Sequence, residues 1–126
     1  MKTPANLQYS KSHEWILFTD ETTAKVGLTD FAQDSLGSLV FVNLPEVGDR
    51  LTAGETLGDV ESVKAVSDVI SPVSGEVAAI NEELLDAPEK INEAPYDAWL
   101  VEVTGISDRE ELLDAAAYDA FCKEEA

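Results

Sequence analysis

The first third of the chain contains short apolar runs that are typical of β-strands. EWILF (14–18) and TAKVGL (23–28) are rich in β-branched and aromatic residues, and the turn-prone TDET separates them. A third run, SLVFVNLP (38–45), predicts a strand that ends at a proline. Before it, LTDFAQDSLG (28–37) predicts a short helix, because its threonine or first aspartate can cap the start and its last glycine suits the stop.

The middle of the chain alternates polar turns with short apolar segments. VGD (47–49), AGE (53–55) and SGE (74–76) are the predicted turns. The predicted strands lie around them, at TLGDVESV (56–63), AVSDVISP (65–72) and EVAAIN (76–81). Short strands with turns at close intervals are typical of a β-barrel or β-sandwich.

The C-terminal third predicts a loop, a strand and a helix. EELLDAPEKINEAPYD (82–97) contains two prolines and reads as a loop with at most one helical turn, and AWLVEVTG reads as a further strand. Ser107 and Glu110 have the spacing of a capping box, which predicts a helical segment over about residues 107–123. The alternative is a break near Asp114, whose side chain would cap the start of a second short helix.

The composition is that of a globular protein with a strongly acidic surface. The chain has 126 residues, 44% of them hydrophobic, so we expect a single domain over 1–126 with a barrel core at about 8–105. Its formal net charge is -18, from 26 acids against 8 lysines and arginines. This charge repels nucleic acid and anionic membranes and favours partners with basic docking faces, although solubility alone would also explain it.

Cysteine and histidine are too scarce for a disulfide or a metal site. Cys122 is the single cysteine and His13 the single histidine, so we expect no metal and a packed or hydrogen-bonded His13. Without a Ser/His/Asp series or a phosphate loop, the chain is not expected to be an enzyme. No apolar run approaches membrane-spanning length, and the N-terminus has no signal core or long Arg-rich leader, so we expect a cytoplasmic protein, or a mitochondrial matrix protein if a leader was removed.

One lysine stands alone in an acidic region. Lys64 lies within DVESVKAVSDVISP (59–72) and is the only lysine or arginine between Arg50 and Lys90. Two predicted strands flank it so closely that the chain must reverse near residues 63–65, which puts the amine at an exposed tip. Neighbouring acids favour a charged amine and argue against a Schiff-base nucleophile. A solvated surface lysine and a covalent attachment point both remain open.

Ordered matches on both sides of this lysine resemble one known family. They include YSKSHEWI (9–16), VGLTDFAQDSLGSLVFVNLPEVGD (26–49), AGE (53–55), VESVKAVSDVISPVSGEV (60–77), and NEAPY followed by Trp99. The chain is similar to the H protein of the glycine cleavage system, a carrier whose cofactor is lipoate on a lysine. The resemblance implies a mainly β fold, a small flattened barrel-sandwich hybrid of the lipoyl/biotinyl type, with a short internal helix and a C-terminal helical segment.

The same resemblance implies roles for four residues. Lys64 matches the lysine to which lipoate is covalently attached. Ser12, Glu14 and Asp68 match residues that hold the loaded arm in a surface cleft. Each also has an ordinary interpretation, as a turn serine, a solvated strand acid and a hairpin acid. Trp15, Phe31 and Trp99 are expected to belong to the core.

The implied function is that of a non-catalytic shuttle. The carrier takes the aminomethyl group of glycine from glycine decarboxylase, which uses pyridoxal phosphate, to an aminomethyltransferase that uses tetrahydrofolate. Dihydrolipoyl dehydrogenase then reoxidises the lipoyl group through FAD and NAD. A lipoyl-attaching enzyme is the fourth implied partner, and no nucleic acid or membrane is expected to bind.

Three related classes are the alternatives. A biotin carboxyl carrier usually has methionines beside its lysine, but the only methionine here is Met1. A lipoyl domain of a 2-oxoacid dehydrogenase usually has an aspartate before the lysine, where this chain has Val63. A lipoate relay or regulatory binding protein could have the same barrel and lysine, so this alternative remains open.

Overall fold

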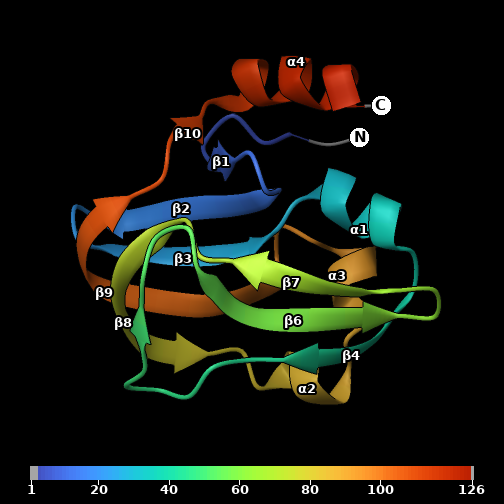
Figure 1. Cartoon of the computed structure of the whole chain (residues 1–126), viewed down its shortest axis with the longest axis horizontal. Coiled ribbons are helices and arrows are strands. Elements are labelled where there is room, and N and C mark those ends of the chain that lie inside the picture. The colour runs from blue at the N-terminus through green and yellow to red at the C-terminus, as the bar shows by residue number, and fades with distance from the viewer. Residues whose placement is uncertain (1–2, 126) are drawn as a thin grey trace.

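The computed structural model describes residues 3–125, which form mainly antiparallel β-strands (Figure 1). A seven-stranded sheet has the order β10-β1-β2-β3-β9-β8-β5, and a three-stranded sheet has the order β4-β6-β7. The larger sheet consists of β1 (Gln8–Ser10), β2 (Glu14–Asp20), β3 (Thr23–Leu28), β5 (Arg50–Leu51), β8 (Val73–Ile80), β9 (Trp99–Arg109) and β10 (Leu112–Leu113). The smaller consists of β4 (Leu39–Asn43), β6 (Thr56–Ser62) and β7 (Val66–Ile70). The expected mainly β fold is confirmed.

The two sheets share one apolar core. Along β8, buried and more exposed residues alternate, as the period of two along a strand requires. Val26, Val77 and Val103 of the larger sheet are fully buried, and they belong to the same cluster as Val60 and Val69 of the smaller sheet. Their burial supplies the main driving force that holds β6 and β7 in place.

Three short helices connect the strands. α1 (Asp30–Leu36) begins as predicted, since the Thr29 hydroxyl accepts the Ala32 N–H at 3.1 Å. It ends at Gly37, whose φ of 83° favours glycine. α2 (Glu83–Asp86) and α3 (Lys90–Glu93) are single turns within the segment that was predicted to be mostly loop.

One predicted turn is wrong because strand pairing overrides it. Residues 74–76 lie inside the continuous strand β8 instead of forming a turn. Gly75 is required there by packing, since a methyl group on it would lie 2.6 Å from Cγ1 of Val103 on β9. The glycine therefore marks a close approach of two strands.

The predicted capping box at Ser107 and Glu110 is also wrong. Ser107 lies in β9, whose end pairs with β8 through Asp108 and Arg109, so long-range strand pairing prevails over a local cap. The helix is α4 (Ala115–Glu125), and the Asp114 carboxylate accepts the Ala117 N–H at 2.8 Å. The helical segment therefore begins just after the alternative break at Asp114 and replaces the predicted range of about 107–123.

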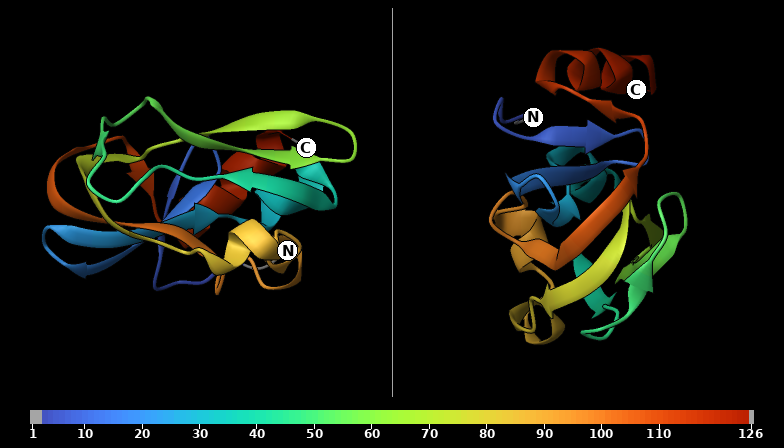
Figure 2. Two further views of the ribbon diagram at one scale, coloured as in Figure 1. Left: turned by 90° about the horizontal axis from the view of Figure 1, so that it is seen from below. Right: turned by 90° about the vertical axis from the view of Figure 1, so that its left-hand side faces the viewer.

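α4 lies over β1 and β10 at one end of the molecule (Figure 2). Its buried residues Tyr118 and Cys122 form a second apolar cluster with Tyr9 and Trp15, and the rings of Tyr9 and Tyr118 stack with centroids 4.6 Å apart. This cluster connects the C-terminal helix to the start of β2. None of the helices within residues 3–125 is long and apolar enough to cross a membrane.

Candidate functional site

The β6–β7 hairpin projects from the molecule beside α1, in both Figure 1 and Figure 2. Its turn is closed by the Ser62 N–H, which donates to the Ala65 carbonyl at 2.8 Å. The Ser62 hydroxyl accepts the N–H groups of Lys64 at 3.3 Å and Ala65 at 3.1 Å. These hydrogen bonds stabilise the turn without the glycine or asparagine that is common in hairpin turns. The predicted reversal at residues 63–65 and the exposure of Lys64 are confirmed.

The tip of the hairpin rests against the end of α1. The Val63 N–H donates to the Ser38 carbonyl at 3.3 Å. A methyl group on Gly37 would lie 3.4 Å from Cε and 3.9 Å from Nζ of Lys64. The end of α1 therefore supports the turn on one side, while Val63 remains 77% exposed beside the lysine.

Next to the hairpin is a cavity of about 140 Å³. Ser12, Glu14 and Asp68 all line it, so the structure brings together the three residues that were expected to hold the arm. The apolar part of the cavity lining includes Leu28, Phe31, Leu36, Val60 and Val69. Asp68 is exposed at its rim, and Lys64 lies outside it at the end of the hairpin.

Glu14 is a buried carboxylate, only 1% exposed, and not the solvated strand acid of the ordinary interpretation. Its Oε1 accepts the hydroxyls of Ser10 at 2.6 Å and Ser12 at 2.5 Å, and its Oε2 accepts the Ile70 N–H of β7 at 3.3 Å. Within residues 3–125, Glu14 has no ion pair. Burial raises the pKa of the Glu14 carboxyl from 4.5 to about 7, although the three hydrogen bonds oppose this rise.

Sequence reasoning missed the contribution of Ser10. Its hydroxyl donates to the Glu14 side chain, and it also accepts the Glu14 N–H at 3.0 Å. The available signal was the hairpin itself, because residues on either side of a tight turn between antiparallel strands lie opposite each other. Ser10 is itself buried, at 2% exposure.

The structure tests the predictions for His13, Trp15 and Phe31. His13 is hydrogen-bonded, to Tyr118 and Glu125, and Trp15 is a core residue at 2% exposure, so both expectations are confirmed. Phe31 is half-buried and packs against the cluster of Tyr9, Trp15 and Tyr118, and it also lines the cavity, where it stacks on His13. The cavity therefore has an aromatic surface as well as acidic groups.

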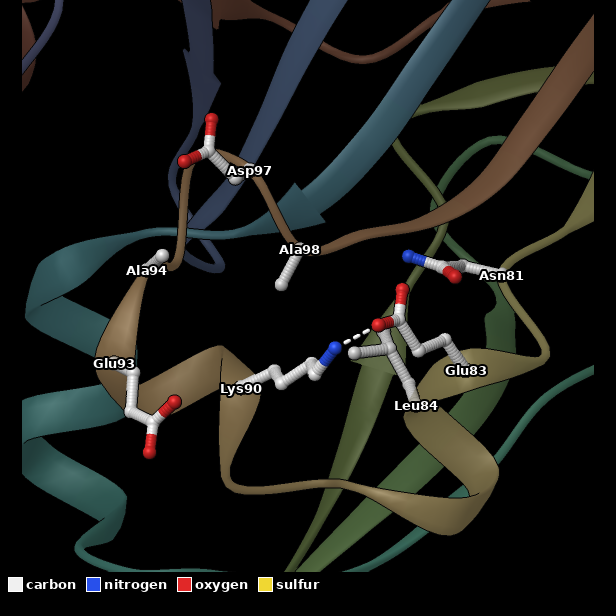
Figure 3. A pocket seen from close by; sticks show the side chains of 8 residues that line it. All are labelled: Asn81, Glu83, Leu84, Lys90, Glu93, Ala94, Asp97 and Ala98. Carbon is white, nitrogen blue, oxygen red and sulfur yellow. Dashed lines mark ion pairs between the residues drawn. The ribbon is translucent and has the colours of Figure 1, made fainter.

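A second cavity, of about 300 Å³, lies between α2, α3 and the start of β9 (Figure 3). Lys90 points across it and forms an ion pair with Glu83. None of its lining residues belongs to the hairpin, and its cation is already paired. Within residues 3–125, no group of three or more His, Cys, Asp or Glu side chains is arranged to hold a metal ion. We therefore place the candidate site at the hairpin and the cavity beside it.

Comparison with known proteins agrees with this geometry. The family model described as Glycine cleavage H-protein matches residues 7–125. A glycine cleavage system H protein from Lachnoclostridium phytofermentans is 61% identical and is covered over 98% of its length by 99% of this chain. A probable glycine cleavage system H protein from Pyrococcus furiosus is 50% identical, with 97% of this chain and 93% of the relative covered. The crystal structure of a glycine cleavage system H protein from Mycobacterium marinum superposes with a TM-score of 0.88 at 40% identity, covering 98% of this chain and 99% of the other.

A small β-domain that presents a lysine on a braced hairpin has the architecture of a cofactor carrier. Because the family model and the full-length relatives agree, the chain belongs to the glycine cleavage H-protein family. It is a lipoyl carrier of the glycine cleavage system and a non-catalytic component of it. Proteins of this family carry their lipoyl group on a lysine, and their partners are the other components of the system.

Proposed function

We propose that Lys64 carries the lipoyl group and that Ser12, Glu14 and Asp68 hold the loaded arm. The observation that carries the proposal is the exposed amine on a braced turn, beside a cavity whose buried carboxylate has no ion pair within residues 3–125. An attaching enzyme needs an accessible nucleophile at a defined place. The small neighbours of Lys64 allow a second protein to approach closely.

The residues of the cavity suit an aliphatic arm that ends in an amine. Leu28, Leu36 and Val69 provide apolar contact for the methylene chain. Glu14 provides a carboxylate that so far accepts hydrogen bonds from neutral donors only. When bound, the lipoyl group supplies a dithiol–disulfide couple and a long reach.

The chain's own groups position and shield the cargo. Ser10 and Ser12 fix the Glu14 carboxylate by donating to its Oε1. A positive charge that approached Glu14 would favour ionisation of its carboxyl and would form a charge-assisted hydrogen bond. Asp68, at the rim, would add attraction while remaining in water. The apolar part of the lining would exclude water from the cargo.

The proposed partners each contribute the chemistry that this chain lacks. They are glycine decarboxylase with pyridoxal phosphate, an aminomethyltransferase with tetrahydrofolate, dihydrolipoyl dehydrogenase with FAD, and a lipoyl-attaching enzyme. We propose that they meet the carrier in the cytoplasm. The net charge of -18 favours fast, reversible docking to basic faces of these enzymes.

Intact-mass analysis and peptide mapping test the attachment site. The chain is incubated with lipoate, ATP and a lipoyl-attaching enzyme, alongside Lys64→Arg and the control Lys11→Arg, which changes another exposed lysine. We expect a single lipoyl increment on the 59–72 region in the wild type and the control, and none in Lys64→Arg. An increment that persists in Lys64→Arg, or a biotin increment in protein from the native host, would overturn the proposal.

A further inference from the structure

His13, between the cleft residues Ser12 and Glu14, has an unusual backbone. Its φ of 74° is the only positive φ of a non-glycine residue within residues 3–125. Such a conformation is unfavourable for a side-chain-bearing residue and persists where surrounding contacts enforce it. The His13 N–H donates to the Ser10 carbonyl at 3.1 Å and closes the turn that brings both serine hydroxyls to Glu14. The position of the Glu14 carboxylate therefore depends on the backbone conformation of His13.

The ring of His13 is fixed by the C-terminal helix and by α1. Its Nδ1 lies 2.7 Å from the Tyr118 hydroxyl and its Nε2 lies 2.6 Å from Oε2 of Glu125, both on α4. The ring also stacks on Phe31 of α1, with centroids 4.5 Å apart and planes at 25°. No residue of α4 lines the cavity. The helix therefore reaches the cavity through His13, which is one of its lining residues.

Tyr118 also connects His13 to the start of α1. Its hydroxyl also lies 2.7 Å from Oγ1 of Thr29, the residue that caps α1, and the Thr29 N–H donates to the His13 carbonyl at 3.2 Å. One direction of donation satisfies every group: Thr29 donates to Tyr118, Tyr118 donates to His13 Nδ1, and His13 Nε2–H donates to Glu125. Burial raises the pKa of Tyr118 above its ordinary value, so the phenol keeps the proton that it donates.

We propose that His13 is a positioning residue, through which α4 sets the relative placement of the two walls of the cleft. One wall is the Ser12–Glu14 segment and the other is α1, and the hydrogen-bonded chain from Thr29 through Tyr118 to His13 ties them together. The inference deepens the proposed arm-holding function and rests on it. Loosening α4 would widen the cleft without altering any residue that lines it.

The first experiment uses the chain without a lipoyl group, so it does not depend on arm holding. The Ile70 N–H donates to Glu14, so its amide hydrogen exchange reports whether the carboxylate stays in position. NMR titration of Glu14 reports whether the carboxyl stays buried. His13→Gly removes the ring but keeps the left-handed backbone available. Tyr118→Phe removes only the hydroxyl. Asp119→Ala is the control, because Asp119 binds Thr3 from the same helix.

We expect His13→Gly and Tyr118→Phe to raise the exchange rate of Ile70 about tenfold, the effect of losing one hydrogen bond. The Glu14 titration should move down from about 7 toward 4.5 as the carboxyl gains water. Exchange of the Val60 amide, in the same sheet, should stay unchanged in both variants. In Asp119→Ala, the exchange rate of Ile70 and the titration of Glu14 should both match the wild type. Wild-type values for Ile70 and Glu14 in both variants would overturn the proposal.

The second experiment uses the lipoylated chain and measures how long the loaded arm keeps its cargo. Tyr118→Phe should shorten this lifetime severalfold, whereas Asp119→Ala should not. If Glu14→Gln shortens the lifetime and Tyr118→Phe does not, the positioning role of His13 is wrong while the holding function stands. If Glu14→Gln itself has no effect, the holding function fails, and the exchange and titration results decide the role of His13 separately.

Discussion

The hairpin tip and the cleft are built in different ways. The tip consists of four consecutive residues, 62–65, whose hydrogen bonds are mostly with one another, and its lysine is exposed. The cleft combines a turn before β2, one face of α1 and the edge strand β7, and its carboxylate is buried. A group that partners must reach can be presented by a local turn. A group that must hold a charge away from water requires the whole fold.

This difference predicts that substitutions act differently in the two regions. Changes at the tip should alter chemistry while lowering the free energy of unfolding by no more than about 1 kcal/mol, because little apolar surface is buried there. Changes in the cleft, or in the residues that pack against its lining, should alter both the chemistry and the free energy of unfolding. Four substitutions test this difference between the tip and the cleft.

Lys64→Arg should have the largest effect on function and the smallest on stability. Arginine keeps the positive charge but cannot accept the lipoyl group, so glycine–bicarbonate exchange with glycine decarboxylase should fall to background. The free energy of unfolding should change by no more than about 0.5 kcal/mol, since the side chain is exposed. Glycine–bicarbonate exchange that persists in Lys64→Arg would mean that the shuttle function does not depend on Lys64.

Trp15→Ala should have the largest effect on stability. Trp15 follows Glu14, is 2% exposed, and its indole N–H donates to the Pro95 carbonyl at 3.0 Å. Truncation of a buried tryptophan costs about 3–5 kcal/mol, which urea unfolding would measure. Molecules that remain folded should still be lipoylated at Lys64, because the turn is local. A cost below about 1 kcal/mol would contradict the dependence of the Glu14 region on this core.

Glu14→Gln should stabilise the chain in a pH-dependent way. The folded-state pKa of about 7 lies above the ordinary value of 4.5, so the contribution of Glu14 to wild-type stability is greatest below 4.5 and declines as the pH rises toward 7. Glutamine does not ionise. Unfolding of both proteins should therefore give similar free energies near about pH 4, and an advantage for the variant of about 3 kcal/mol near about pH 8. An advantage that is the same at both pH values would mean that Glu14 does not titrate as a buried acid.

Ser62→Ala should have small effects on both stability and function. It removes the hydroxyl that accepts two N–H groups of the turn, at a cost of about 1 kcal/mol in thermal or urea unfolding. The rate of lipoyl attachment should fall a fewfold because Lys64 is held less firmly. Ser62→Thr, which keeps the hydroxyl, is the matched control and should attach at the wild-type rate.

The same contrast explains what the sequence could predict. The turn at Lys64 and the cap at Thr29 depend on neighbouring residues, so local patterns predicted both. The burial of Glu14 depends on β7, some 55 positions away along the chain, and no local pattern encodes it. The capping box at Ser107 failed for the same reason, because pairing of β9 with β8 decided the structure of that segment.

In the proposed function the tip carries the cargo and the cleft protects it, and one comparison tests this most directly. Wild-type chain and Glu14→Gln are lipoylated, loaded to the same extent from glycine, separated from the enzymes and followed by mass spectrometry near neutral pH, with the exposed Glu55→Gln as the control. We predict equal loading and an approximately tenfold faster loss of cargo from Glu14→Gln, since a partly buried charge pair contributes on the order of 1.4 kcal/mol. Equal lifetimes in all three proteins would contradict the protective role of the cleft.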